Sequence, residues 1–322
     1  MLRTKCTLPA LVCLSLLLNG CGPHSTYTRP ELDLPQTWNQ PGDSRTAGVD
    51  QWWRQFHDEA LNHLVDQVLL RNNDLAVAAL QLRKARLLAE LAESDRLPGF
   101  SVQGSGQISR NLGSSSSENR KFSASGTVSY ELDLWNKLGS VSDAARWEAV
   151  ATEQDRQSTA LSLVGTTASL YWQIGYLNQR ITLSQNSIEY ARQTLALVRV
   201  QKAAGAATGL EILEAERSLA NQEASHTQLV QQRVEALNGL AILFNGPPRS
   251  LQVREPADLQ GVSLPAIDAG IPGELLSRRP DLRAAEARLR STLAETDATR
   301  ASYYPSFNLN GSYGGSSERL SR

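Results

Sequence analysis

The sequence predicts a mainly α-helical fold with a few long antiparallel β-strands, arranged as two internal repeats of which the second is incomplete. Three observations lead to this prediction. Apolar residues recur at alternating steps of three and four over long stretches, which is the heptad spacing of coiled-coil helices. Three runs of roughly ten residues alternate between apolar and polar side chains, which is the pattern of a β-strand. Two segments of the chain also match each other at a shift of 207 residues.

The composition excludes several classes of protein. The 322 residues carry 32 Lys and Arg against 33 Asp and Glu. A general nucleic-acid binder needs a basic face, so we expect no nucleic-acid partner. The hydrophobic fraction of 41% argues against a polytopic helical membrane protein. The His residues have no metal-ligand spacing, no Ser lies in a GxSxG elbow, and no complete dinucleotide loop is present, so the sequence predicts no enzyme, metal site or bound cofactor.

Residues 1–20 have the features of a signal peptide. A short positive region precedes an apolar stretch over residues 8–18 that is too short to span a bilayer as a helix. The stretch ends in a Leu-Asn-Gly-Cys sequence that resembles a bacterial lipobox, in which Cys21 becomes the first mature residue. This predicts covalent N-acyl and S-diacylglycerol lipid on Cys21, because several acyl chains anchor a protein stably. An ordinary signal peptide with an incidental cysteine is the alternative.

Residues 21–57 are expected to form a lipid-anchored N-terminal tether, rich in Pro in its first half. A first repeat is expected over residues 58–244. It begins with one helix over about residues 58–96, whose apolar seam is interrupted by Arg71. The seam consists of Leu61, Leu64, Val68, Leu75, Ala78 and Leu82. Pro98 ends this helix.

Two alternating runs follow, at residues 98–109 and 121–134. Phe100, Val102 and Val128 belong to the apolar parity, and Ser, Gln and Thr fill the other. Each run has about the length that a tilted strand needs to cross a bilayer, ~9–11 residues. A soluble hairpin with one buried face explains the alternation equally well, and on these two runs alone it is the preferred interpretation.

A long helical hairpin is expected over residues 140–244. Its first helix, from about Ser140 to Ala203, contains no Pro. A helix much longer than about 25 residues indicates a coiled coil, a membrane span or a helical array, and the scattered charges exclude a membrane span. Gly205 and Gly209 mark the reversal before the second helix. Residues 245–272 contain five Pro and are expected to form an irregular equatorial linker.

Residues 273–322 repeat the start of residues 58–244. The shift of 207 residues places Asp74 on Asp281 and Pro98 on Pro305, so the change from helix to strand recurs at the same place. A third strand is therefore expected over residues 305–314. A faithful repeat predicts a fourth strand and a second hairpin, so these 322 residues are expected to be a C-terminally truncated fragment, which puts closure of a barrel by this chain in doubt.

With these features the chain resembles the outer-membrane efflux proteins, most of all their TolC-like, NodT-type lipoprotein branch. The motifs that carry the resemblance are Trp53, Phe56-His57-Asp58, Asn73-Asp74-Leu75, Glu131-Leu132-Asp133-Leu134-Trp135, Gly205, Leu210-Glu211 and Arg278-Arg279-Pro280-Asp281-Leu282. The resemblance implies transmembrane β-strands that join a twelve-stranded barrel in a homotrimer, with an α-barrel across the periplasm. It also implies a passive outer-membrane channel of a tripartite efflux system in a Gram-negative bacterium, working with a periplasmic adaptor protein and an inner-membrane pump.

The resemblance further implies a role for the turn between the long helices. Gly205, Thr208, Gly209, Leu210 and Glu211 would form a periplasmic tip that contacts the adaptor. For Glu211 two interpretations stand side by side. Its carboxylate would either join a polar constriction that favours cations or complement the dipole of the helix that begins there.

A second hypothesis belongs to a different class: a lipid-anchored periplasmic coiled-coil protein that binds partners and has soluble hairpins. The two hypotheses predict opposite surroundings for Phe100, Val102, Val128 and Leu309. These side chains face outward in a membrane channel, where one strand face meets lipid. They pack inside a soluble core in the alternative.

Overall fold

The computed structural model describes residues 25–31, 51–110, 118–247, 254–265 and 277–319. Their elements, in chain order, are η1 (Trp52–Phe56), α2 (Glu59–Arg71), α3 (Asn73–Ser94), β1 (Gly99–Arg110), β2 (Glu118–Leu132), α4 (Lys137–Ala203), α5 (Gly209–Leu243), α7 (Pro280–Ala301) and β3 (Phe307–Ser317). The chain divides into two compact units, described separately below. Helices α3 and α4 contribute to both units.

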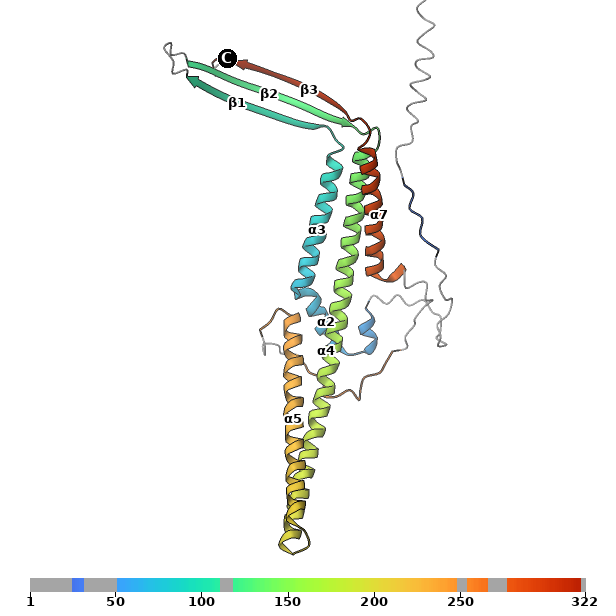
Figure 1. Cartoon of the computed structure of the whole chain (residues 1–322), viewed down its shortest axis with the longest axis vertical. Coiled ribbons are helices and arrows are strands. Elements are labelled where there is room, and N and C mark those ends of the chain that lie inside the picture. The colour runs from blue at the N-terminus through green and yellow to red at the C-terminus, as the bar shows by residue number, and fades with distance from the viewer. Residues whose placement is uncertain (1–24, 32–50, 111–117, 248–253, 266–276, 320–322) are drawn as a thin grey trace, which may run out of the picture. The chain divides into compact units, whose positions relative to one another are not determined.

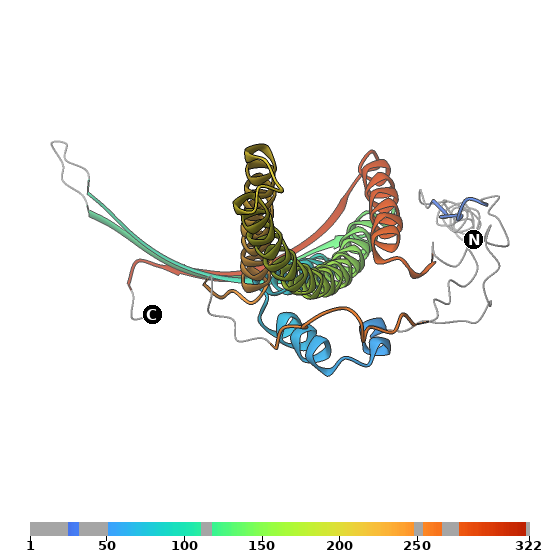
Figure 2. The same cartoon turned by 90° about the horizontal axis from the view of Figure 1, so that it is seen from below.

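The first unit comprises Met1–Asp33, Gln81–Gln154 and Asp281–Arg322. It contains a three-stranded antiparallel sheet in the order β1-β2-β3, and helices α3, α4 and α7 lie alongside one another below the strands (Figure 1). The strands bend gently along their length (Figure 2). Helix α7 packs closely on α4. The close approach is seen in the hydrogen bond that the Ser291 hydroxyl donates to the Ala144 carbonyl at 2.9 Å.

The internal repeat is present in the structure. Helices α3 and α7 both contain 22 residues, and their bounds differ by the predicted 207 residues at each end. Strands β1 and β3 follow them after the same kind of Pro-containing turn. The predicted fold class, mainly helical with antiparallel strands in two repeats, is confirmed.

The second unit comprises Leu34–Leu80 and Asp155–Pro280. In it the C-terminal part of α4 and the antiparallel helix α5 form the predicted hairpin (Figure 1). Its core joins η1 and α2 to these two helices through side chains that are 5% exposed or less: Trp53, Leu61, Leu64, Val65, Val164, Ala168, Tyr171, Ile174, Leu177, Ala236 and Leu240. This core provides the hydrophobic free energy that holds the helices together.

The single helix predicted over residues 58–96 is wrong, because Asn72 breaks it into α2 and α3. Asn72 has extended backbone angles, and its Oδ1 accepts hydrogen bonds from the N–H groups of Asp74 and Leu75 at 2.9 and 3.1 Å. Its Nδ2 donates to the carbonyl of Leu243 at the end of α5, at 3.1 Å. Asparagine therefore caps a new helix here, while the apolar spacing continues across the break and conceals it.

The predicted end of the tether at residue 57 is also wrong. Residues 52–56 form the 3-10 helix η1, and Trp53 lies in the core with 5% exposure. Asp58 then caps α2 by accepting hydrogen bonds from the N–H groups of Ala60 and Leu61. Residues 52–56 therefore belong with the helices of the first repeat, because the indole ring of Trp53 is buried among them. The predicted signal peptide, residues 21–24 and residues 32–50 lie outside the described residues.

Candidate functional site: the strand sheet and the hairpin turn

The strand register separates apolar from polar side chains on the two faces of the sheet. Directly paired residues share a face in an antiparallel sheet. Phe100 pairs with Val128, which pairs with Gly311, and Tyr130 pairs with Leu309, so the apolar parities of all three strands coincide. The opposite face aligns Ser101 with Thr127 and Ser312, Ser105 with Ser123 and Ser316, and Glu131 with Asn308. The sheet therefore has one apolar face and one polar face.

The apolar face is uncovered. The exposed fractions are 78% for Phe100, 89% for Val102, 40% for Val128 and 57% for Leu309. Tyr313 on the same face is 91% exposed. A soluble protein buries an apolar face of this size in its core. Its exposure here therefore marks a surface that contacts lipid or another protein. The alternative hypothesis of a soluble hairpin predicted that Phe100, Val102, Val128 and Leu309 pack inside a core. Their exposure contradicts that prediction.

The register of the three strands includes a stagger between the two repeats. Moving straight across from Phe100 through Val128 leads to Gly311. The repeat equivalent of Gly311 is Gly104, which lies four residues beyond Phe100. Crossing two strands thus shifts the chain by four residues, and such a stagger accompanies tilted strands in barrels.

A strand-to-helix junction connects β2 to α4. The Asp133 carboxylate accepts hydrogen bonds from the N–H groups of Leu138 and Gly139, at 3.0 and 2.7 Å, and so satisfies the free donors at the start of α4. A Cβ atom at Gly139 would lie 2.0 Å from Oδ1 of Asn136, so a larger residue there would require the Asn136 side chain to move. The Trp135 ring stacks on Tyr304 at a centroid distance of 4.9 Å, which ties this junction to the one between α7 and β3.

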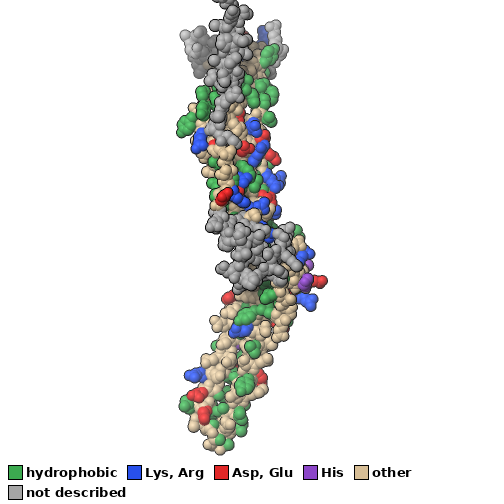
Figure 3. All heavy atoms as spheres, turned by 90° about the vertical axis from the view of Figure 1, so that its right-hand side faces the viewer, with side chains coloured by type: hydrophobic (Ala, Val, Ile, Leu, Met, Phe, Trp, Pro, Cys, Tyr) green, Lys and Arg blue, Asp and Glu red, His purple; other side chains and the backbone are tan. Residues whose placement is uncertain are grey.

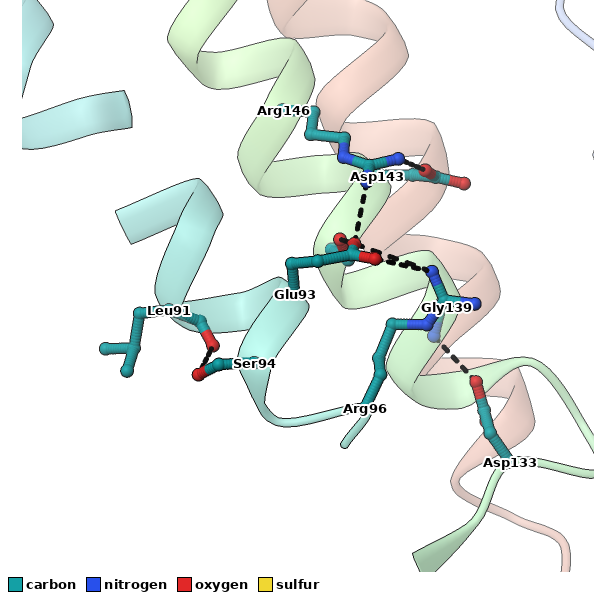
Figure 4. A network of polar contacts seen from close by, with 9 residues as sticks. Leu91, Glu93, Ser94, Arg96, Asp133, Gly139, Asp143 and Arg146 are labelled. Carbon is teal, nitrogen blue, oxygen red and sulfur yellow. Dashed lines mark hydrogen bonds and ion pairs between the residues drawn. The ribbon is translucent and has the colours of Figure 1, made fainter. Parts of the chain in front are cut away.

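A polar network lies next to this junction, between α3 and α4 (Figure 4). Glu93 Oε2 accepts hydrogen bonds from the Ser142 hydroxyl at 2.6 Å and from Arg146 at 2.7 Å. Arg96 approaches the same carboxylate at 3.4 Å, and Arg146 also pairs with Asp143 at 3.6 Å. The hydrogen bond from Ser142, with the charges of Arg146 and Arg96, lowers the pKa of Glu93.

The turn between α4 and α5 is a compact reversal. Gly205 has a φ of +77°, the N–H of Ala206 donates to the Gln201 carbonyl at 2.8 Å, and the N–H of Gly205 donates to the Lys202 carbonyl at 2.9 Å. This is a Schellman ending, for which glycine is the preferred residue. It explains Gly205 as a requirement of the backbone.

Glu211 is engaged within the turn. Its Oε2 accepts a hydrogen bond from the N–H of Thr208 at 2.5 Å, as part of a capping box at the start of α5. The geometry therefore favours the helix-start interpretation of Glu211. Leu210 beside it is 65% exposed, so the turn presents an apolar side chain to its surroundings.

Two ion pairs fix the register of the hairpin beyond the turn. Arg199 pairs with Glu216 at 2.8 Å, and Arg192 pairs with Glu223 at 3.0 Å. The two pairs are seven residues apart on both helices, so they lie on one side of the α4–α5 seam. Exposed pairs of this kind contribute little to stability and serve mainly to align the helices.

The described residues hold no cluster of His, Cys, Asp or Glu with the arrangement of a metal site. In that same part of the chain we find no helix with the length and apolar character of a membrane span. Basic and acidic side chains intermix on the face shown in Figure 3. Cys21, the predicted lipid attachment site, lies outside the described residues.

A family model described as "Outer membrane efflux protein" matches residues 64–246 and 271–322. The chain belongs to the outer membrane efflux protein family. The predicted resemblance is thereby confirmed, and the chain is an outer-membrane protein with helices that extend into the periplasm.

Two curated relatives of this chain are named as export proteins. "Toxin and drug export protein A" of Aggregatibacter actinomycetemcomitans is 31% identical over 272 residues, which cover 84% of this chain and 59% of that protein. "Pyoverdine export outer membrane protein OpmQ" of Pseudomonas aeruginosa is 32% identical over 322 residues, which cover 96% of this chain and 68% of that protein. The chain thus spans from three fifths to two thirds of the length of these relatives.

Solved outer-membrane channels share the fold of this chain. The outer-membrane channel OprN superimposes with a TM-score of 0.78 at 30% identity, covering 91% of this chain and 68% of that one. The open state of the MtrE outer-membrane channel of Neisseria gonorrhoeae gives a TM-score of 0.80 at 28% identity, covering 93% of this chain and 68% of that one.

Several residues that build these regions were missed in the sequence. Asp133 was noted only as part of a motif, although an Asp shortly before a long helix is a cap signal. Glu93, Ser142 and Arg146 come together only in the tertiary structure. Residues 25–31, predicted as part of a tether, contact α7 through Ser25 and Arg29.

Proposed function

We propose that this outer membrane efflux family protein is the channel component of a tripartite export system. It passively conducts small molecules from the periplasm or from an inner-membrane pump to the exterior. Its relatives are named for the export or efflux of a toxin and drugs, an antibiotic, toluene and pyoverdine. The chemical range of these compounds supports a conduit whose selectivity is low.

The single observation that carries the proposal is the division of the sheet into an exposed apolar face and a polar face. Val102 at 89% exposure lies on the first, and its neighbour Gln103 lies on the second. In a membrane barrel the apolar face meets acyl chains and the polar face lines a wet lumen. Among the described residues no strand pairs with the outer edges of β1 and β3. Lipid cannot satisfy the backbone groups at such edges, so the sheet needs further strands beside it.

A homotrimer would supply those strands. Helix α3 supports this part of the proposal, because its large apolar side chains Leu80, Leu87 and Leu91 are 65%, 54% and 58% exposed. Leucines left uncovered along one helix are typical of a protein-protein contact. A further copy of the chain is the partner that a closed channel requires.

The turn at Gly205, Thr208, Gly209, Leu210 and Glu211 would contact a periplasmic adaptor protein. The exposed Leu210 supports this assignment, since apolar side chains at a rigid turn make good anchors for a partner. In the same proposal Cys21 carries N-acyl and S-diacylglycerol lipid that anchors the chain in the outer membrane. The protein has no catalytic role, and transport is driven by the pump.

Cysteine labelling tests the proposal. Val102→Cys and Gln103→Cys, expressed in the outer membrane, place single thiols on opposite faces of β1. We expect a bilayer-soluble maleimide to label position 102 and a membrane-impermeant maleimide to label position 103. Val128→Cys and Thr127→Cys on β2 repeat the comparison with a matched pair.

Efficient labelling of both positions by the impermeant reagent would overturn the channel assignment and favour a soluble periplasmic protein. A drug-accumulation assay in a strain that lacks its own outer-membrane channel adds a functional readout. Expression of the chain is expected to lower the accumulation of a fluorescent efflux substrate.

A further inference from the structure

Three arginines share the apolar face of the sheet at the end that lies far from the helices. Arg110 is the last residue of β1, and Arg120, near the start of β2, pairs with the apolar Ile108. Arg319 lies two residues beyond Ser317, the last residue of β3. All three therefore have the parity of the apolar side chains, because alternate residues of a strand share a face. They are called the arginine cluster below.

The charge of the arginine cluster is only partly neutralised. Arg120 pairs with Glu118 at 2.7 Å. Within the described ranges the side chains of Arg110 and Arg319 form no ion pair, and all three arginines are exposed. A basic side chain on the lipid face of a barrel is costly at the bilayer midplane and tolerated near the interface. These arginines are thus suited to the edge of the membrane.

The length of β1 places the arginine cluster at that edge. Phe100 starts the apolar parity beside the helices, and Arg110 lies 110 − 100 = 10 residues further along. At ~3.4 Å per residue this is about 34 Å of strand. A strand tilted by about 40° then rises about 26 Å, close to the ~25 Å height of the apolar band of a barrel. Because the helices extend into the periplasm, the arginine cluster lies at the outer boundary of the membrane.

The apolar face is hollowed next to the arginine cluster. Gly104, Ala124 and Gly315 are directly paired across the three strands, so no side chain larger than a methyl group covers this row. A hollow of about 720 Å³ lies over the row, and Phe122 and Arg319 also line it. Most of the lining residues belong to the apolar parity, so the hollow opens on the apolar face. Its volume falls in the range of ~300–1,000 Å³ that is typical of ligand sites.

Larger side chains border the hollow on two sides. Toward the helices, the next paired row contains the highly exposed Val102 and Tyr313. Toward the arginine cluster, the Phe122 ring leans over Gly106, where a Cβ atom would lie 3.1 Å from the ring. The hollow is therefore apolar within and has a cationic rim at its outer end. This combination fits an amphiphile with an acyl chain and an anionic head group.

We infer that the arginine cluster and the hollow bind lipid A, the phosphorylated glycolipid of the outer leaflet. This inference rests on the proposed function, because it requires the apolar face to lie in the outer membrane. Guanidinium groups match phosphate oxygens in charge and in bidentate geometry. The phosphates of the glucosamine head group would lie on Arg110 and Arg319, and an acyl chain would fill the hollow over Gly104 and Gly315.

The position of the arginine cluster selects lipid A among anionic lipids. Phosphatidylglycerol also has a phosphate and acyl chains, but in the outer membrane it belongs to the inner leaflet, beside the helices. The arginine cluster lies at the opposite end of the strands from Gly99 and Leu132, where β1 begins and β2 ends. A phosphate at that opposite end belongs to the outer leaflet.

Lipid binding by the purified protein tests this inference. The chain is extracted from outer membranes into dodecyl maltoside and titrated with bisphosphorylated lipid A, and native mass spectrometry gives an apparent Kd from the lipid-bound fraction. Arg110→Gln combined with Arg319→Gln should raise this Kd by roughly 25-fold, since one basic residue near an anionic lipid surface contributes a factor of about five. Monophosphorylated lipid A should bind the parent chain more weakly than the bisphosphorylated form.

Lys121→Gln is the matched control for charge. Lys121 neighbours Arg120 in β2 but pairs with Gln107 on the polar face. Its replacement removes one positive charge at the same height and should leave the Kd unchanged. Hydrogen exchange of β2 amides, equal in all variants, verifies that the sheet stays folded.

A second pair of variants tests the hollow. A Cβ atom at Gly315 or at Gly311 meets open space, so both positions of β3 accept a side chain. Gly315→Leu fills the hollow and should raise the Kd severalfold. Gly311→Leu adds the same side chain to the same face outside the hollow, and it should have no effect.

Three results would overturn the lipid A site. They are an unchanged Kd in the double arginine variant, an equal rise in Lys121→Gln, and equal affinity of the parent chain for phosphatidylglycerol and lipid A. Equal effects of Gly315→Leu and Gly311→Leu would refute the hollow as the acyl-chain site. Any of these results, together with bilayer labelling of Val102→Cys, would leave the channel proposal standing.

Discussion

Helices α3 and α7 have the same length and occupy equivalent places in the two repeats, but their surfaces differ. At four equivalent positions on one face, α3 has Val77, Leu80, Leu87 and Leu91, whereas α7 has Ala284, Ala287, Ala294 and Ala298. The α3 side chains are 54–65% exposed. The alanines at 284, 287 and 298 are 1%, 3% and 8% exposed.

The same backbone pattern therefore serves two purposes in the two repeats. Small side chains on α7 let it approach α4 closely, as the bond between Ser291 and the Ala144 backbone demonstrates. Large side chains on α3 leave the equivalent face open within this chain. The repeat thus sets the helix and strand bounds, while the side chains decide which face is filled internally and which is offered to a partner.

The largest expected effect concerns Gly314 of β3, whose counterpart in β1 is Gln107. A Cβ atom at Gly314 would lie 2.6 Å from the Ala124 carbonyl oxygen and 2.7 Å from the Ser125 Cβ. Gly314→Ala must therefore displace backbone, and we expect a loss of about 3 kcal/mol in unfolding free energy. Denaturant titration of the chain in detergent, with hydrogen exchange of β2 amides, measures it.

Gly315 provides the matched control, because a Cβ atom there meets open space. Gly315→Ala should be neutral or slightly stabilising, since it restricts the unfolded chain. Equal losses from both substitutions would mean that close strand approach at residue 314 is not the cause.

Exchanging residues between the helices gives the next effect. Ala287→Leu places the side chain of Leu80 into the tightly packed α7 surface. Overpacking there should cost about 2 kcal/mol, and it should loosen the contact between α7 and α4. Differential scanning calorimetry and hydrogen exchange of α7 amides report the change. An unaltered melting temperature would show that the alanine face of α7 accommodates a leucine side chain without strain.

Helices α3 and α7 also differ in charge, because Glu93 of α3 corresponds to Arg300 of α7. The pKa of Glu93 lies below its ordinary value of 4.5, chiefly because of the hydrogen bond from Ser142. Its contribution to stability is thus present above pH 4.5 and is lost as the pH falls through the lowered pKa. Glu93→Gln should lower the melting temperature modestly at pH 7 and flatten its dependence on acid pH.

The smallest effect on folding is expected at the exposed α3 leucines. Leu80→Ala and Leu87→Ala should change the unfolding free energy of the chain by about 0.5 kcal/mol or less, since the side chains touch little. If α3 binds a further copy, the same substitutions should weaken self-association. Sedimentation in detergent separates the two outcomes, and a large stability loss without any change in association would contradict the contrast with α7.

Much of the fold was predictable because it depends on periodicity. The change from period 3.5 to period two after Pro98, and its recurrence at Pro305, led to strands within a few residues of the observed β1 and β3. The long hairpin followed from the absence of Pro and from the glycines at its turn. The break at Asn72 was not predicted in this way, because the spacing of the seam resumes at Leu75 after the interruption at Arg71, and the cap is stabilised by the distant Leu243 carbonyl.

The turn between α4 and α5 and the apolar face of the sheet were likewise predictable only in part from the sequence. Gly205 and the strand parity were identified from residue type and spacing. The engagement of Glu211 with Thr208, and the exposure that separates a lipid face from a soluble core, required coordinates. Residues 25–31 were predicted as part of a tether, because Pro-rich composition indicates extended chain but does not reveal that this segment contacts α7.

Local patterns in the sequence therefore specify the elements of this protein, the two faces of its strands and its internal repeat, because these depend on steric and hydrophobic periodicity within short stretches. Tertiary structure decided the pairing of Ser25 with Asp297, the stacking of Trp135 on Tyr304 and the network at Glu93. These contacts join residues far apart in the chain, and their free energy depends on distance, burial and direction in space, which no local pattern encodes.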